Sequence, residues 1–107
     1  MTVEATDALA DRVKQALRMV IDPELGDNIV DLGLVYYVAV HEGGAAYIVM
    51  TTTTRGCPAA AYLKDGARDS AKSVSGIGSV EVSLTYDPEW SPSMMSAGTM
   101  SRLGIAG

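Results

Sequence analysis

The sequence has 107 residues, of which 48% are hydrophobic and 20% are charged, and its formal net charge is −5. This balance predicts one globular domain over residues 1–107 and excludes a disordered chain. The basic residues are scattered along an acidic chain, which argues against nucleic acid or an anionic membrane as a partner.

The N-terminal segment is acidic and polar, and it lacks the basic start and apolar stretch of a signal peptide. No apolar run approaches the roughly 20 residues that span a bilayer. A single cysteine cannot form an internal disulfide, so nothing requires an oxidising compartment. These features predict a cytoplasmic protein.

A first helix is predicted over residues 7–20, where apolar residues recur at helical spacing after Thr6 as a candidate N-cap. The pair Asp22-Pro23 ends it, because a residue before proline is disfavoured in the helical region. A turn-rich acidic loop follows.

Two strands are predicted over residues 34–41 and 46–53, which are rich in β-branched and aromatic types. The glycine-containing segment 42–45 suits a hairpin between them. The first strand is apolar on both faces, so helices on one face would leave apolar side chains uncovered. We therefore expect either the C-terminal segment or a partner subunit to cover the other face.

The second half begins at the only cysteine. Cys57 is predicted as the N-cap of a helix with Pro58 at its first position, ending at the glycine-containing segment 75–78. Residues 80–87 alternate between apolar and polar types, which predicts a third strand with one buried face.

Ser91 as N-cap and Pro92 at the first position favour a last helix that runs to about Leu103. The element order is therefore α-β-β-α-β-α. This order predicts an α+β fold with a three-stranded mixed sheet and helices packed mainly on one face. A core of this size gives marginal stability, so we also expect a homodimer.

Cys57 is the residue best placed to carry chemistry. A cysteine at a helix start lies near unpaired backbone N–H groups and the positive end of the helix dipole, and both favour the thiolate. Arg55 would act in the same direction, whereas Asp22 or Glu24 nearby would act against it. The alternative for a lone cysteine is a small buried apolar residue.

The threonines at positions 51–54 are either strand formers at a strand end or hydroxyl groups that line a pocket beside Cys57. One cysteine and one histidine cannot supply a closed structural zinc site, which usually takes four such ligands.

Several segments resemble the PaaD- and SufT-type metal–sulfur cluster biosynthetic proteins over roughly residues 9–104. They occur in the family's order and at nearly the family's spacing. They are VIDPELG at 20–26, NIVDLGLV at 28–35, MTTTT at 50–54, GCP at 56–58 and YDPEWSPSMMS at 86–96. The resemblance implies an α+β fold of the iron–sulfur assembly superfamily and a role in assembling or delivering iron–sulfur clusters.

The resemblance also implies a site that joins the acidic turn, the threonines and the cysteine. Carried over to this chain, its residues are Asp22, Glu24, Thr53, Thr54 and Cys57. Two further candidates are Asp31 in the DLGLV segment and Arg55, which departs from the proline or small residue more usual in the family. Cys57 is the expected metal ligand.

Thiolate suits iron in sulfide clusters, but such clusters usually have four cysteine ligands. One thiol per chain therefore favours iron or a labile iron–sulfur cluster shared between subunits, with none tightly bound by one chain. The expected partners are the iron–sulfur assembly machinery and client apoproteins. The leading hypothesis is an assembly or carrier factor that acts through Cys57 and is not an enzyme.

Two alternatives stay open from the sequence. The first is a non-catalytic adaptor for maturation of a multicomponent oxygenase of the phenylacetate-degradation type, which the PaaD resemblance implies. The second is a small cysteine-dependent enzyme that uses Cys57 as a nucleophile.

Overall fold

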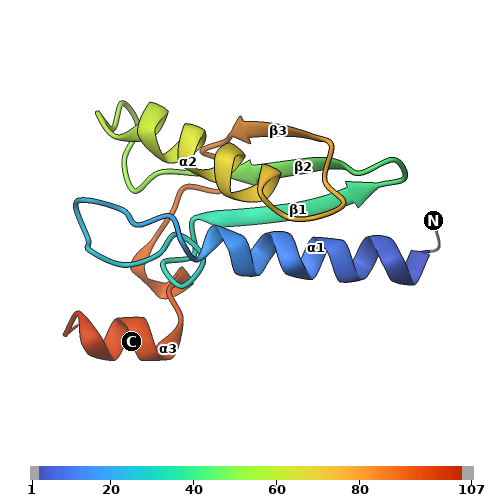
Figure 1. Ribbon diagram of the computed structural model, residues 1–107. Coiled ribbons are helices and arrows are strands. Elements are labelled where there is room, and N and C mark those ends of the chain that lie inside the picture. The colour runs from blue at the N-terminus through green and yellow to red at the C-terminus, as the bar shows by residue number, and fades with distance from the viewer. Residues whose placement is uncertain (1–2, 105–107) are drawn as a thin grey trace.

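The structure is a computed structural model that describes residues 3–104 (Figure 1). Its α-β-β-α-β-α order and three-stranded mixed sheet confirm the predicted α+β fold. The elements in chain order are α1 Val3–Leu17, β1 Val35–His41, β2 Ala45–Met50, α2 Ala60–Lys72, β3 Ser79–Leu84, the short 3₁₀ helix η1 Pro92–Met94 and α3 Ala97–Arg102.

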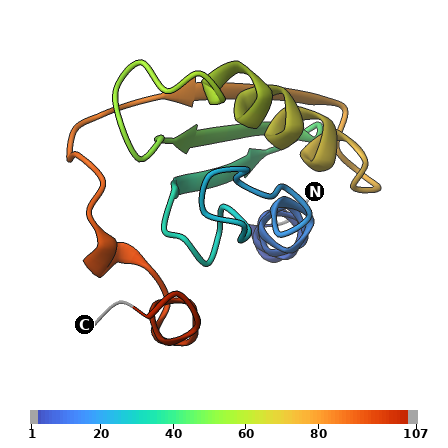
Figure 2. The same cartoon turned by 90° about the vertical axis from the view of Figure 1, so that its left-hand side faces the viewer.

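The sheet has the order β1-β2-β3, in which β2 is antiparallel to β1 and parallel to β3. Figure 2 shows α1 and α2 together on one face of this sheet, as predicted. Apolar side chains from that face, from both helices and from the loop before β1 form the core. Its large, fully buried members are Val13, Leu17, Ile29, Leu32, Leu34, Ile48, Met50 and Leu63.

The first helix differs from the prediction at both ends. It begins at Val3, so Thr6 lies inside the helix and is not its N-cap, and it ends at Leu17. The next three backbone N–H groups bond three residues back, as in a 3₁₀ turn; that of Val20, for example, donates to Leu17 O at 3.1 Å. This tighter winding keeps Val20 in the core, which explains the longer apolar pattern.

The prediction that Cys57 is the N-cap of α2 is wrong. The helix begins at Ala60 with Ala59 at the N-cap position. The carbonyl oxygen of Cys57 instead accepts a bond from the Ala60 N–H at 3.0 Å, so Cys57 opens a turn that precedes the helix. The second strand also ends earlier than predicted, at Met50, where the pairing with β3 ends at Leu84.

The last predicted helix is divided into η1 and α3. Met95 and Ser96 between them are extended, with ψ of 153°. Ser96, and not Ser91, is the N-cap of α3, because its side chain accepts a bond from the Thr99 N–H. The break lets the Ser96 N–H donate to Asp31 O at 2.8 Å, which ties the C-terminal segment to the loop before β1.

The C-terminal segment covers part of the second sheet face, as one of the two predicted alternatives requires. After β3 it crosses the end of the sheet on the side opposite α1 and α2 (Figure 2). The Tyr36 hydroxyl donates to Pro88 O at 2.9 Å, and Trp90 Nε1 donates to Leu32 O at 2.7 Å. Farther along, Tyr37 stays 55% exposed and meets Tyr47 edge to face.

No helix within residues 3–104 combines the length and apolar character needed to cross a membrane.

Candidate functional site

The acidic turn is folded around the carboxylate of Asp22. This side chain is fully buried, and its Oδ1 accepts bonds from the N–H groups of Glu24 at 2.7 Å and Leu25 at 3.1 Å. The Asp22 backbone closes the loop with two further bonds, to Asp27 O and from the Gly26 N–H. Pro23 suits this turn because its ring presets φ. The bonded Oδ1 thus holds the Asp-Pro-Glu-Leu turn in shape.

The second carboxylate oxygen of Asp22 has no protein partner. Oδ2 is buried, and no described residue offers it a hydrogen bond. A buried carboxylate oxygen without a partner is costly, and its neutralisation requires a proton or a cation. The turn therefore presents an unsatisfied acceptor to the protein interior.

Cys57 lies against this turn. Its side chain is 6% exposed, and its Sγ lies 3.6 Å from Oε1 of Glu24, to which the thiol donates. Gly56 before it has a φ of 70°, in the left-handed region that glycine adopts without strain. This turn lets Cys57 contact Glu24 while Arg55 lies over the ring of Tyr86.

The environment of Cys57 favours the neutral thiol. Burial is the largest effect and raises the pKa of Cys57 above the ordinary 9.0, and the charges of Glu24 and Asp22 raise it further. The Ala59 N–H bonds to the sulfur and lowers this pKa, but the pKa remains raised. The backbone and the two carboxylates therefore act in the directions predicted for them, and burial together with the carboxylates outweighs the backbone.

Thr53 and Thr54 lie in a different pocket. A cavity of about 270 Å³ is lined by Thr52, Thr53, Thr54, Arg55, Tyr86, Glu89 and Trp90. Its lining includes neither the acidic turn nor Cys57. The loop from β2 to α2 thus contributes to two sites. Its threonines and Arg55 line the cavity, whereas Cys57 contacts the acidic turn. The aromatic and acidic members from the late YDPEW segment are lining residues that sequence reasoning did not identify.

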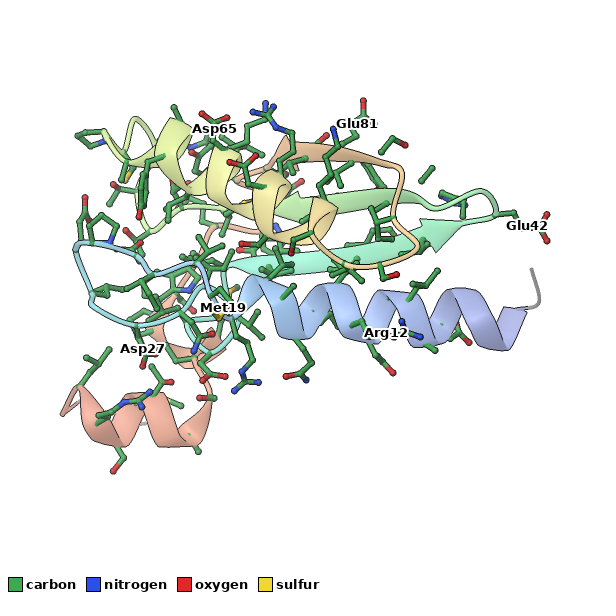
Figure 3. The ribbon with its side chains drawn as sticks, in the orientation of Figure 1. Arg12, Met19, Asp27, Glu42, Asp65 and Glu81 are labelled. Carbon is green, nitrogen blue, oxygen red and sulfur yellow. The ribbon has the colours of Figure 1, made fainter. Side chains whose placement is uncertain are left out.

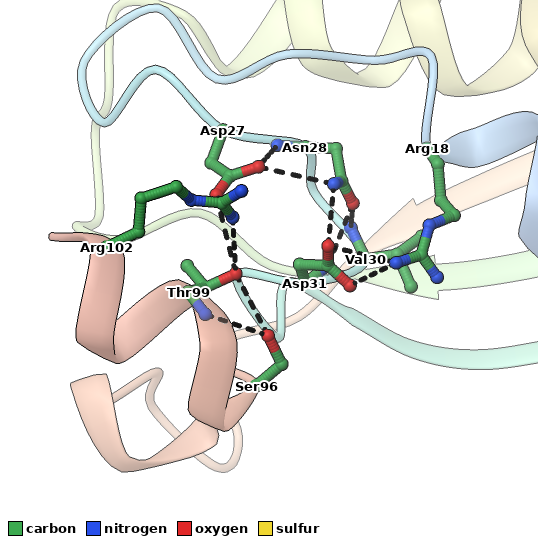
Figure 4. Close-up of polar contacts among 8 residues, drawn as sticks. All are labelled: Arg18, Asp27, Asn28, Val30, Asp31, Ser96, Thr99 and Arg102. Carbon is green, nitrogen blue, oxygen red and sulfur yellow. Dashed lines mark hydrogen bonds and ion pairs between the residues drawn. The ribbon is translucent and has the colours of Figure 1, made fainter.

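The contacts of the Asp31 side chain are structural. Its carboxylate accepts a two-pronged ion pair from Arg18 Nη2, at 2.8 and 3.0 Å, and a bond from Asn28 Nδ2 (Figure 4). Beside it, Asp27 is paired with Arg102 and Thr99 of α3 (Figure 4). These contacts anchor the loop that carries the acidic turn, and none of them involves Cys57.

The described residues hold no set of three or more His, Cys, Asp or Glu side chains placed to bind a metal ion by themselves. Glu24 and Cys57 are in contact, and the charge of Asp22 acts on the same thiol. What one chain presents is thus a partial ligand set, with one soft sulfur and hard carboxylate oxygens.

The fold and this site define a small α+β domain with one buried thiol beside an acidic turn. The chain belongs to the iron–sulfur cluster assembly protein family, whose pattern matches residues 10–84. This finding confirms the predicted resemblance to iron–sulfur cluster assembly proteins.

Named relatives agree with that assignment. The chain is 41% identical to a Porphyromonas gingivalis protein named Fe-S protein maturation auxiliary factor, over 87% of this chain and 89% of the relative. It is 40% identical to the Fe-S protein maturation auxiliary factor SufT of Staphylococcus aureus, over 82% of this chain and 100% of the relative. A crystal structure of a Bacillus anthracis domain of unknown function matches with a TM-score of 0.93 and 36% identity. The match covers 98% of this chain and 100% of the other.

Proposed function

We propose that this protein assists the maturation of iron–sulfur proteins by binding iron, or a labile iron–sulfur cluster, through Cys57 and passing it to client apoproteins. Family membership and the names of the relatives support an assembly role. The observation that carries the cysteine-centred mechanism is the contact of the buried Cys57 thiol with Glu24, in the turn that Asp22 holds in shape.

The donor atoms suit iron as cargo. Thiolate and carboxylate both bind iron, and the contact between Cys57 and Glu24 brings one donor of each kind together. When iron binds, the Cys57 proton must leave to solvent, because the thiolate and not the thiol is the ligand. The negative charges of Glu24 and Asp22 then favour the bound cation, although they raise the thiol pKa in its absence.

The same features favour release. One sulfur per chain leaves iron incompletely ligated, so a second subunit or small thiols must complete the set. The raised pKa of Cys57 means that a proton competes with iron for the sulfur. A client with a full set of cysteines can therefore take the cargo. We propose a homodimer for this reason, and light scattering of the purified protein tests it.

Anaerobic reconstitution with ferrous iron and sulfide, followed by desalting and incubation with an apo-ferredoxin, tests the proposal. We expect the wild-type protein to retain a visible chromophore and to restore the ferredoxin. Cys57→Ala should lose both properties while its circular dichroism stays unchanged. A chromophore of equal yield and equal transfer in Cys57→Ala would overturn the mechanism.

A cluster-free adaptor is the second candidate, and exposed apolar side chains favour it. Met19 is 78% exposed, Tyr62 is 62% exposed, and both line one surface hollow. Exposed apolar groups that share a hollow are typical of protein contact sites. The reconstitution separates the two candidates, because an adaptor retains no chromophore in either form of the protein.

A further inference from the structure

The cavity beside Arg55 has the features of a small-molecule site of its own. It measures about 270 Å³ and lies between the loop after β2 and the segment after β3. The cavity is distinct from the cysteine site, because neither Cys57 nor Glu24 lines it. The inference drawn from it does not depend on the proposed function.

Arg55 supplies a positive charge with free donors. Its guanidinium lies 5.1 Å from the centroid of the Tyr86 ring, and its Nε lies 3.7 Å from Oε1 of Glu89. Both partners of that ion pair are exposed, so the pair is weak. Among the described residues, no hydrogen bond uses the two terminal nitrogens of Arg55. The Tyr86 ring therefore orients a fork of N–H groups that is open to a ligand.

Tyr86 supplies an acceptor, which follows from the count of protons. The Thr52 hydroxyl donates its one proton to Thr54 O at 2.6 Å. Its 2.8 Å bond with the Tyr86 hydroxyl must then run the other way, with tyrosine as the donor. The Tyr86 oxygen keeps lone pairs and has no proton left to give. It is thus matched to a ligand group that donates.

The remaining lining is rigid on one side and adaptable on the other. Trp90 is held by the bond from its Nε1 to Leu32 O at 2.7 Å. The hydroxyls of Thr53 and Thr54 make no hydrogen bond with any residue in the described range, so both can turn toward a ligand. An aromatic wall, a cation, an acceptor and two free hydroxyls thus converge on one space.

We propose that this cavity binds a small hydroxycarboxylate. The Arg55 fork takes the carboxylate, and the Tyr86 oxygen accepts from the ligand hydroxyl. A carboxylate fits better than phosphate, because one cation that already faces Glu89 cannot balance a dianion on a chain of net charge −5. A small acid fits within the volume of about 270 Å³.

Trp90 is the only tryptophan, so its fluorescence reports on this cavity directly. We expect lactate, added at constant ionic strength, to cause a saturable change. Propionate, which lacks the hydroxyl, should bind more weakly, and inorganic phosphate should bind more weakly than lactate. Equal responses to lactate and propionate, a stronger response to phosphate, or no saturable response to lactate would overturn the proposal.

Two variants assign the roles. Arg55→Met should weaken lactate binding by about tenfold or more, the loss expected for a charge-assisted contact. Arg68→Met, which removes an exposed arginine paired with Asp65 on α2, is the matched control and should bind as wild type does. Tyr86→Phe keeps the ring under Arg55 and should erase the preference for lactate over propionate. An unchanged affinity in Arg55→Met, or an unchanged preference in Tyr86→Phe, would contradict the assignment.

Discussion

At the scale of single residues, the proton on Cys57 links the site to stability. Because burial first and then two carboxylates raise the folded pKa above 9.0, the folded protein keeps this proton at a pH where the unfolded chain loses it. The stabilisation is complete below about pH 9 and is lost as the pH rises through the folded pKa. In urea titrations above that pH, the free energy of unfolding should fall more steeply for wild type than for Cys57→Ala. Parallel curves for the two proteins would contradict the raised pKa.

Glu24 should restrain the reactivity of the same thiol. Its charge and its contact with Sγ both raise the pKa of Cys57, although less than burial does. Glu24→Gln should therefore increase the thiolate fraction and speed alkylation by iodoacetamide a few-fold at neutral pH. Glu42→Gln is the matched control, because Glu42 lies on the hairpin, at the opposite end of the molecule from Asp27 (Figure 3). Equal alkylation rates in both variants would show that Glu24 has no effect on the thiol.

Asp22 has a structural role through Oδ1, and we propose a binding role for its charge. Asp22→Ala removes the acceptor of two backbone N–H groups and should cost about 1–3 kcal/mol in the free energy of unfolding. Asp22→Asn keeps an oxygen for these bonds and should cost less, yet it loses the charge that would hold iron. Urea denaturation together with iron titration measures both effects. An Asn variant that binds iron as wild type does would leave Asp22 only the structural role.

At the scale of elements, polar contacts hold α3 against the loop before β1. Arg102 of α3 pairs with Asp27, and Ser96 at the start of α3 donates to Asp31 O. Figure 4 shows these residues in one polar cluster with Arg18 and Asn28. The cluster therefore joins α3 to the loop whose other end is the acidic turn. It accounts for Asp31 as a residue that positions the site from outside it.

Gly33 allows the backbone of Met94 to lie close to the loop before β1. It has a φ of 77°, and a Cβ atom there would collide with the carbonyl oxygen of Met94. Gly33→Ala should therefore cost about 2 kcal/mol or more in the free energy of unfolding. Gly43 has a similar φ of 87° with open space around it, so Gly43→Ala carries only the conformational penalty of about 1–2 kcal/mol. Equal losses in the two variants, measured by urea denaturation, would show that the approach of Met94 is unimportant.

At the scale of the whole molecule, local patterns were sufficient to predict the elements and their order. Alternation along β3 and the proline after Asp22 both indicate local structure, and both predictions hold within a few residues. Some of the differences at element ends are local turns, at residues 18–20 and at Cys57, and one involves a distant partner. Ser91 and Pro92 begin η1 as predicted, for example, but the helix does not continue to Leu103, and the Ser96 N–H at the break bonds to Asp31 far away in the chain.

The site was less accessible to sequence reasoning. The contact between Glu24 and Cys57 joins residues 33 positions apart, and only the family resemblance indicated it. The Thr52–Tyr86 bond spans 34 positions and creates the second cavity, which no local pattern reveals. The sequence left the direction of the Cys57 pKa open for the same reason, since burial and the approach of two carboxylates are tertiary effects.

The central claim is that Cys57, with carboxylates beside it, is an iron ligand. X-ray absorption at the iron edge, on protein loaded anaerobically with ferrous iron and no sulfide, tests this most directly. We predict a mixed shell of sulfur and oxygen in wild type and a shell of light atoms alone in Cys57→Ala. A wild-type spectrum without iron–sulfur scattering, or one that Cys57→Ala reproduces, would contradict it.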